Sequence, residues 1–545
     1  MQENIPNEKL PSVDSLPDLS NGLPELHYPK QINAAVEMTD VHVEAGRGND
    51  VAIYFEGDEI TYEVLKRRVN KLGNALLNLG IEPGERVFVR FPNRPEYVVS
   101  CLAAQKIGAV PVPSMKLLRA NEISYVLSDA EPRLAIVDET LLEEVLEADE
   151  IEGGVLDEIV VSERTDGDHG YHRYEEIIAD ESDSLSTAET SRDDAVMLAY
   201  TSGTTGQPKG TLHTHRQMLA IADGYANYCL DPRQDDVFCS NAPIAFTFGY
   251  GMEVAFPLRF GASTVLIEDA EPEDLVRAVD EYGVTVLGSI PTAYNQLFSQ
   301  AEKITSEYDL SSLRIGVSAG EPLPPSTYEQ AKELFEIDLL DGIGTTEMLH
   351  IFISHQHDDE ISPTATGFPV PGYECRVADP ETGEELDRGE PGLLEVRGPT
   401  GITYWDRPEK QNETVRDGWS VPGDIFIHRE DGRFEYKSRR DDLIITSGYN
   451  VPGPEVENVL EDHETVYESA VVGSPDEERG QIVRAFVVLS EGVEASDELT
   501  DTLQDFVKDR IAPYKYPRQI EYVSELPKTE TGKIRRAKLR ERGRQ

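Results

Sequence analysis

The segment "AVMLAYTSGTTGQPKGTLHTH" (195–215) joins a short apolar run to a loop that concentrates hydroxyl groups and glycines. Residues 195–200 have the pattern of a buried strand, and the residues after 214 follow a helical pattern. We therefore expect the loop at the carboxyl end of a strand, where α/β proteins bind ligands. Glycines let backbone N–H groups approach an anion, hydroxyls add uncharged donors, and a lysine adds mobile charge. The loop predicts a polyphosphate site made by Thr201, Ser202, Gly203, Thr204, Thr205, Gly206 and Lys209.

This loop is not a Walker A motif. That motif requires GxxxxGK[ST], whereas Lys209 is followed by Gly210. A hydroxyl-rich surface loop is the alternative interpretation, but such a density of donors directly after a strand favours phosphate binding.

The neighbouring sequence alternates short β-branched runs with amphipathic helical patterns, which predicts an α/β fold with layered, largely parallel sheets. The runs expected to be strands are 85–91, 133–138, 195–200, 263–268, 284–290 and 314–320, and the helical patterns are 61–80, 215–230 and 272–283. After about residue 370 the pattern changes to short strands with glycine turns. We expect a large N-terminal domain (1–437) built from several subdomains, a hinge (438–442) and a small mobile α+β lid (443–545).

The net charge of −53 in 545 residues is unusual, and the carboxylates are spread along the chain. We interpret them as a solvated, salt-adapted surface, because net charge bears on solubility and not on fold. Four cysteines without metal spacing fit a reduced, cytoplasmic location. Neither a signal peptide nor a membrane span is indicated. The histidines of "HTH" (213–215) and "HQH" (355–357) lack ligand spacing, which favours structural or solvated roles.

Two further motifs suggest a nucleotide site. "DGIGTTEMLH" (341–350) repeats the glycine and threonine theme and adds Glu347, a single carboxylate of the kind that holds Mg²⁺ together with phosphates. "GWSVPGDIF" (418–426) places Asp424 after a glycine turn, where a carboxylate can accept hydrogen bonds from ribose hydroxyls.

Taken in order, "YTSGTTGQPKG", "DGIGTTE", "GWSVPGD", "SRRDDLIITSGYNVPGPEVE" and "PKTETGKIRR" resemble the motifs of the adenylate-forming superfamily of acyl- and aryl-CoA ligases, peptide-synthetase adenylation domains and firefly luciferase. The resemblance covers roughly residues 40–540. It implies two half-reactions: a carboxylate attacks MgATP to give an acyl-adenylate and pyrophosphate, and a thiol then displaces AMP.

The resemblance also assigns roles to residues. Lys533 would bridge the substrate carboxylate and the α-phosphate, Thr346 would contact the α-phosphate, and Glu347 would hold Mg²⁺. Asp441 would be the hinge residue, while Ser447, Gly448 and Tyr449 would line the CoA tunnel. The remaining nucleotide contacts would be Gly320, Glu321, Pro322, Asp341, Gly342, Ile343, Gly344 and Thr345 around the adenine, and Asp424 and Arg439 at the ribose.

The acyl pocket would be lined by Phe246, Phe248, Gly249, Tyr250, Pro291, Ala293, Ser318, Ala319, Met348 and His350. Phe248 and Tyr250 alternate, so we expect one aromatic face along that segment. "TEMLHIF" (346–352) resembles benzoate- and 2-aminobenzoate-CoA ligases, in which the histidine matching His350 closes a short pocket. An aromatic carboxylate is therefore the expected substrate. A short or medium-chain fatty acid is the alternative.

Free CoA is the expected acceptor, because the sequence shows no carrier domain or serine attachment motif; loading of a carrier protein is the alternative. ATP, Mg²⁺ and CoA are the expected cofactors and co-substrates. We expect a monomer or homodimer with no nucleic-acid or membrane partner.

Overall fold

The computed structural model describes residues 4–164, 170–201, 208–268, 270–446, 449–476, 479–528 and 534–542. The described chain forms two compact units. The first unit lies within Met1–Ser202, Pro208–Cys375 and Val396–Ser420, and the second within Arg376–Glu395 and Val421–Gln545. The predicted hinge (438–442) lies inside the second unit, and its role as a pivot stays a prediction.

The first unit is built on a nine-stranded mixed sheet in which β11, β10, β12, β13 and β14 are mutually parallel. In spatial order its strands are β16 (Phe368–Pro369), β15 (Ile351–Ser354), β14 (Asp338–Gly344), β13 (Ile315–Ala319), β12 (Val286–Ser289), β10 (Val237–Ser240), β11 (Ser263–Val265), β1 (Val51–Phe55) and β2 (Asp58–Thr61). The predicted strands of this region are confirmed, with 263–268 and 284–290 shortened at their ends.

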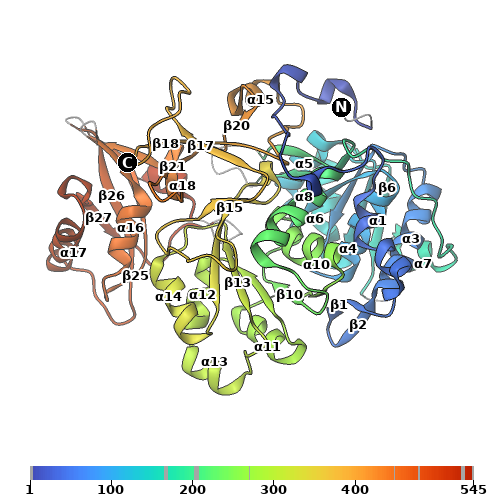
Figure 1. The fold of residues 1–545 in the computed structure, drawn as a ribbon, viewed down its shortest axis with the longest axis horizontal. Coiled ribbons are helices and arrows are strands. Elements are labelled where there is room, and N and C mark those ends of the chain that lie inside the picture. The colour runs from blue at the N-terminus through green and yellow to red at the C-terminus, as the bar shows by residue number, and fades with distance from the viewer. Residues whose placement is uncertain are drawn as a thin grey trace. The chain divides into compact units, whose positions relative to one another are not determined.

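Helices cover this sheet through a shared apolar core. Figure 1 shows α11 (Pro272–Tyr282), α12 (Pro291–Phe298) and α14 (Pro325–Leu334) beside strands β10 to β14. Leu275 and Val279 of α11 pack with Leu297 of α12 and with Leu287 and Leu339 of the sheet. The helices therefore hold the strand ends in place.

A second sheet of the same unit is entirely parallel, as expected from alternating strands and helices. Its order is β4 (Val110–Ser114), β3 (Arg86–Arg90), β5 (Leu134–Asp138), β6 (Glu158–Ser162) and β7 (His172–Arg173). Its connecting helices include α4 (Pro95–Lys106), α5 (Ala120–Ala130) and α6 (Leu142–Ile151). The long helix α3 (Tyr62–Asn78) begins where the Thr61 hydroxyl accepts a hydrogen bond from Val64 N–H, a standard N-cap.

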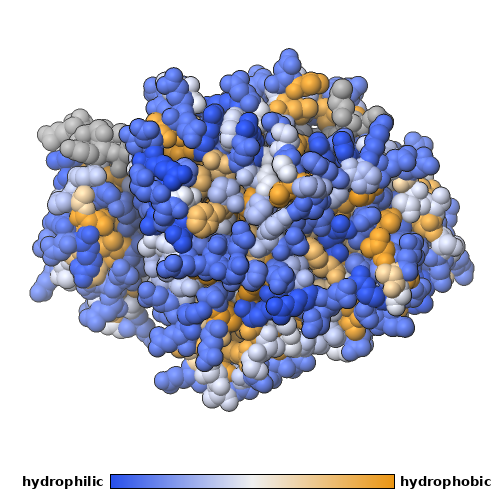
Figure 2. Space-filling view, viewed as in Figure 1, coloured by the Kyte–Doolittle hydropathy of each residue, from blue (hydrophilic) through white to orange (hydrophobic). Residues whose placement is uncertain are grey.

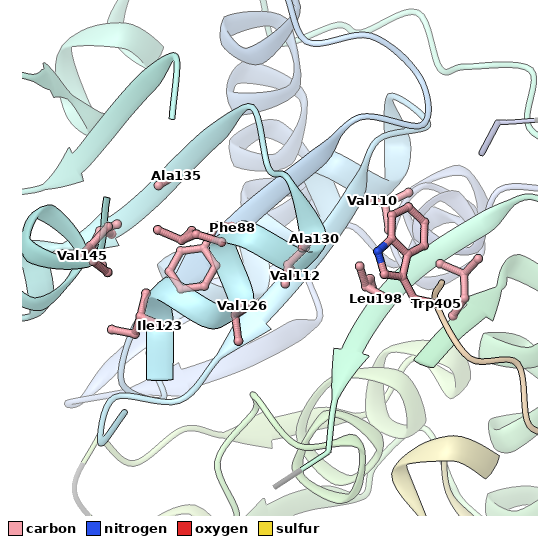
Figure 3. Packing of buried hydrophobic residues seen from close by; sticks show 14 of the residues in the cluster. Phe88, Val110, Val112, Ile123, Val126, Ala130, Ala135, Val145, Leu198 and Trp405 are labelled. Carbon is pink, nitrogen blue, oxygen red and sulfur yellow. The ribbon is translucent and has the colours of Figure 1, made fainter. Parts of the chain in front are cut away.

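The segment 195–215 differs from the expected strand-to-helix order. Strand β8 (Ala195–Tyr200) pairs antiparallel with a second strand, β9 (Gly210–Thr214), and helix α8 (His215–Ile221) follows only then. The predicted phosphate loop is thus the connection of a β-hairpin. The run "GTLHT" is short and contains two β-branched threonines, and these favour a strand over the first turn of a helix. Leu198 of β8 packs beside Trp405 and Val110 in the core shown in Figure 3.

The second unit contains the remaining predicted elements. Strand β21 (Asp424–His428) pairs with β22 (Phe434–Arg439) and with residues 391–393 of β18 (Pro391–Arg397). The predicted lid contains β23 (Leu443–Thr446), β24 (Tyr449–Pro452), α16 (Gly453–Glu461), β25 (Val466–Asp476), β26 (Gly480–Leu489), α17 (Asp497–Arg510), β27 (Gln519–Tyr522) and α18 (Arg536–Arg542). Strands β25, β26 and β27 form one sheet that shares an apolar core with α16 and α17.

The surface matches the composition. Figure 2 shows one face on which hydrophilic side chains predominate and hydrophobic ones are scattered. Among the described helices, none combines the length and the apolar character that a bilayer crossing requires.

Candidate active site

The carboxyl ends of four neighbouring parallel strands gather most of the predicted site residues of the first unit. Strands β10, β12, β13 and β14 lie side by side, with Ser240 opposite Gly288, Ser289 opposite Ser318, and Ala319 opposite Gly342. The segment 242–251 follows β10, Pro291 and Ala293 follow β12, Gly320 to Pro322 follow β13, and Thr345 to His350 follow β14. Ligands of open α/β sheets bind at this edge.

The two predicted adenine segments are adjacent, because β13 and β14 are in register up to Ala319 and Gly342. Glu321 accepts a hydrogen bond of 2.8 Å from the Thr292 hydroxyl, which ties the loop after β13 to the first turn of α12. Burial raises the pKa of Asp341 to about 7, although hydrogen bonds from Thr366 and from Gly342 N–H act in the opposite direction. A carboxyl group that is partly neutral at pH 7 therefore lies at the start of the second segment.

A tight turn after β14 directs Glu347 and His350. The Thr345 hydroxyl accepts a hydrogen bond from Met348 N–H and caps the short helix η8 (Thr346–Met348). Leu349 follows with φ of 69°, a conformation that is strained in a branched residue and is maintained only by its surroundings. A side chain at Gly344 would lie 2.7 Å from the His350 carbonyl, so only glycine fits there. The cap at Thr345 and the close packing at Gly344 therefore fix the conformation of this turn.

His350 is the centre of an aromatic cluster. Its ring, 2% exposed, stacks on Phe248 at 5.7 Å between centroids and meets Phe256 edge-on at 4.6 Å, with Tyr225 at 5.3 Å. Burial lowers its pKa to about 3, although the neighbouring Phe248 backbone acts in the opposite direction. His350 is therefore neutral at physiological pH and would supply no positive charge to a carboxylate.

The prediction of one aromatic face along the segment 246–250 is wrong. Residues Thr247–Tyr250 form helix α9, so side chains two positions apart point in directions that differ by about 200° and do not share a face as they would in a strand. Phe248 contacts His350, whereas the Tyr250 hydroxyl accepts a hydrogen bond of 3.0 Å from Gln105 of α4. Tyr250 packs toward α4, and Tyr225 and Phe256 complete the cluster instead.

The other predicted pocket residues are buried close to these strand ends. Pro291, Gly249 and Met348 are buried, as are Ala293, Ser318 and Ala319, whereas Phe246 is half-buried. The segment that carries Phe246 and Gly249 is fixed by Asn93, whose amide donates 3.0 Å hydrogen bonds to the Ala242 carbonyl and to buried Glu253.

Only the two ends of the predicted phosphate loop are described. Thr201 N–H donates to the Lys209 carbonyl at 3.0 Å, and Lys209 N–H donates to the Thr201 hydroxyl at 3.3 Å. These bonds close the neck of the hairpin loop. Ser202, Gly203, Thr204, Thr205 and Gly206 lie outside the described residues.

Glu347 has a partner that sequence reasoning missed. The Tyr404 hydroxyl donates a 3.0 Å hydrogen bond to Glu347 Oε1. A carboxylate with one oxygen oriented by a neutral donor suits Mg²⁺, which proteins usually hold with one or two carboxylates plus substrate phosphates. No local motif predicts this contact, because the two residues are 57 positions apart in the sequence.

In the second unit, the predicted ribose residues lie together. Asp424 and Arg439 are opposite each other in the β21–β22 register, and Arg439 Nη1 lies 3.1 and 3.2 Å from the two Asp424 oxygens. Asp441 lies in the short helix η9 (Arg440–Asp442). Lys533, Ser447 and Gly448 lie outside the described residues, and Tyr449 begins β24. Lys528 and Ile534, the described residues on either side of the segment that contains Lys533, pair with each other.

Two other features lie apart from these residues. A cavity of about 730 Å³ under the N-terminal segment is lined by Tyr28, Arg192 and Arg216 among others, and none of the predicted site residues lines it. The rings of His213 and His215 are fully buried. Of the two roles expected for these histidines, burial rules out the solvated one and fits the structural one. The described residues include no group of three potential metal-ligating side chains.

Comparison with known proteins supports the nucleotide-binding interpretation. The family model described as AMP-binding enzyme matches residues 41–405, and the model of its C-terminal domain matches residues 455–533. A benzoate–CoA ligase from Thauera aromatica is 37% identical over 96% of this chain and 99% of its own length. An acetyl-coenzyme A synthetase from Bacillus subtilis is 33% identical over 94% of this chain and 90% of its own.

Among solved structures, the anthranilate CoA ligase AuaEII in complex with anthranoyl-AMP has a TM-score of 0.89 at 34% identity, covering 96% of this chain and 99% of that one. The chain belongs to the AMP-binding enzyme family. The prediction of an AMP-forming acyl- or aryl-CoA ligase, with ATP and CoA as substrates, is confirmed at the level of that family.

Proposed function

We propose that the protein activates benzoate or a 2-substituted benzoate as an acyl-adenylate and transfers the acyl group to free CoA. The observation that carries the aryl assignment is the aromatic cluster of His350, Phe248, Phe256 and Tyr225, which adjoins the turn bearing Glu347. Flat aromatic walls favour an aryl ring by about 0.5–1.5 kcal/mol beyond area burial. The similarity of the chain to benzoate- and anthranilate-CoA ligases agrees with this substrate class.

In the first half-reaction, a carboxylate oxygen attacks the α-phosphorus of ATP. The bond from that phosphorus to the bridging oxygen breaks, and pyrophosphate leaves with the electron pair. Two anions must approach each other, so donors and positive charge are required where the charge develops. We assign the β- and γ-phosphates to the hairpin residues 201–209, the α-phosphate to Thr346 and Lys533, and the ribose to Asp424 and Arg439. Mg²⁺, held by Glu347, would neutralise phosphate charge when bound.

In the second half-reaction, the CoA sulfur attacks the acyl carbon, the bond to the AMP oxygen breaks, and AMP leaves. The thiol proton passes to solvent. Ser447, Gly448 and Tyr449 are the proposed tunnel residues, and Asp441 is the proposed pivot between the two reactions, since a few loop residues usually absorb such a change.

A short aliphatic acid is the second candidate, because the acetyl-coenzyme A synthetase of Bacillus subtilis is also similar over most of the chain. The buried, neutral His350 favours the aryl assignment, because its ring packs against the rings of Phe248 and Phe256. We also propose a cytoplasmic, salt-adapted monomer or homodimer. The four cysteines are free, and three of them are fully buried.

The test compares kcat/KM for benzoate, 2-aminobenzoate, acetate, butyrate, hexanoate and octanoate in molar KCl, with CoA as acceptor. ATP–pyrophosphate exchange for each acid separates adenylation from transfer. We expect an aromatic acid to lead by at least tenfold. An aliphatic acid that leads by tenfold would overturn the aryl assignment, and exchange without CoA-dependent AMP release would favour a carrier-protein acceptor.

A further inference from the structure

Tyr404 lies where it can orient the carboxylate of Glu347. Its side chain is 4% exposed, and its hydroxyl donates to Glu347 Oε1 at 3.0 Å. Tyr404 comes from the segment between β18 and α15 (Pro408–Thr414), far from Glu347 in the sequence and outside the motifs that define the predicted site.

The backbone that carries Tyr404 is fixed on both sides. Leu212 N–H donates to the Thr403 carbonyl at 2.8 Å and Trp405 N–H donates to the Gly210 carbonyl at 2.9 Å, so residues 403–405 form a short bridge to β9. Tyr404 N–H donates to the Gln411 side chain at 2.8 Å. The tyrosine is therefore attached to the same strand that ends the phosphate hairpin.

Trp405 anchors this segment in the core. Its ring is fully buried among Leu198, Val110 and other residues of the cluster in Figure 3, and its indole N–H donates to the Asp129 carbonyl at 2.9 Å. A side chain at Gly210 would lie 3.2 Å from Trp405 Cβ, which shows how closely β9 and the segment approach. A donor on so rigid a support has little freedom to leave Glu347.

A second contact links the same strand to the same turn. His213 of β9 is fully buried beside the backbone of Thr346, and burial lowers its pKa to about 3. His213 is thus a neutral partner of the turn at physiological pH. Strand β9 supports both the hairpin at Gly210 and, through His213 and Tyr404, the turn at Thr346 and Glu347.

We propose that Tyr404 is a positioning residue for Glu347, the proposed metal ligand. Its hydroxyl fixes the Glu347 carboxylate so that this carboxylate meets the cation bound to the phosphates of ATP. This inference rests on the proposed role of Glu347. A phenol suits the task because it donates one hydrogen bond without adding a competing charge. Partners of this kind set the orientation and basicity of metal ligands, and their loss costs roughly 10–100-fold in metal affinity.

The test uses Tyr404→Phe, which removes one oxygen and keeps the ring. We expect a fall of at least fivefold in Mn²⁺ affinity, measured by electron paramagnetic resonance of free Mn²⁺ with a non-hydrolysable ATP analogue. This readout needs neither an acyl substrate nor turnover. In ATP–pyrophosphate exchange the Mg²⁺ half-saturation should rise by a similar factor, and excess Mg²⁺ should restore the rate.

Tyr373→Phe is the matched control, because it removes a buried hydroxyl that contacts Thr400 at 2.7 Å in the same unit. It should lower stability without changing metal affinity. Glu347→Gln tests the metal role of Glu347 separately from the positioning role of Tyr404. Unchanged metal affinity in Tyr404→Phe alongside a large loss in Glu347→Gln would overturn the role of Tyr404 alone. Unchanged affinity in both would overturn the metal role of Glu347 and the inference with it.

Discussion

Gly251 determines where the His350 ring can lie, and Gly251→Ala should displace that ring. Gly251 starts the helical stretch η7 (Gly251–Ala255) with φ of −60°, so its backbone would accept alanine. The obstacle is space. A Cβ at this position would lie 2.5 Å from His350 Nε2 and 3.0 Å from Phe256 Cζ, whereas ordinary contacts begin at 3.4 Å.

The magnitude follows from these distances. The His350 ring must move by at least 0.9 Å, the difference between 3.4 Å and the 2.5 Å to Nε2, because its Cδ2 would lie nearer still. The ring is already enclosed by Phe248, Tyr225 and Phe256. Overpacking of this size costs roughly 1–3 kcal/mol. Alanine is otherwise favoured over glycine in a helix by roughly 1 kcal/mol. Gly251→Ala should therefore destabilise the wild type and become neutral or stabilising once His350→Ala has removed the ring.

The assay is a double-mutant cycle in molar KCl, with melting temperatures and kcat/KM for the acid panel measured for the wild type, Gly251→Ala, His350→Ala and the double variant. Gly224→Ala is the control, because the nearest atom to its added Cβ is 3.9 Å away. We expect the sign of the Gly251→Ala effect to change with the background, and benzoate to lose most in the single variant. Equal effects in both backgrounds would refute the steric coupling and remove His350 from the pocket wall.

Four further predictions concern other features of the protein. Lys533→Ala should slow adenylation by about 3 kcal/mol, or roughly 10²-fold, and spare transfer from supplied acyl-adenylate; equal losses in both steps would contradict this. Asp441→Pro should fix φ and separate the half-reactions, with adenylation retained and CoA transfer lost; full turnover would exclude a hinge. Burial raises the pKa of Asp341 to about 7, so its contribution to stability is present below about pH 4 and is lost as pH rises to 7. Melting temperatures from pH 4 to 8 should show this fall in the wild type and a flatter profile in Asp341→Asn. With a net charge of −53, structure and activity should decline between 1 M and 0.1 M salt, where the screening length grows from about 3 to 10 Å; unchanged melting in dilute buffer would argue against salt adaptation.

The sequence predicted most of the candidate site where its residues directly follow parallel strands. Residues that follow consecutive parallel strands must meet at one sheet edge, which is why motifs as distant as Gly320 and Gly342 are neighbours. Asp424 and Arg439 were assigned to the same ligand from separate motifs, and the β21–β22 register places them opposite each other.

What the sequence did not predict depends on contacts between distant segments. The alternation of Phe248 and Tyr250 resembles a strand, but packing against Gln105 and His350 stabilises a helical turn there. Strand β9 was hidden because five residues are too few to distinguish from the start of the following helix. Tyr404 and Gly251 carry no local signal at all, since their importance comes from a hydroxyl and a missing Cβ next to partners elsewhere in the chain.

A protein with 53 excess negative charges is proposed to bind ATP, a carboxylate and CoA, all of them anions. Near 1 M salt the screening length is about 3 Å, so long-range repulsion hardly reaches a ligand and binding depends on atoms in direct contact. The described site is consistent with that requirement. His350 and His213 are held neutral by burial, and Tyr404 presents an uncharged donor to Glu347. Selectivity for the proposed anions would then come from oriented short-range donors on rigid strands, and the acidic surface would serve solubility without opposing the chemistry.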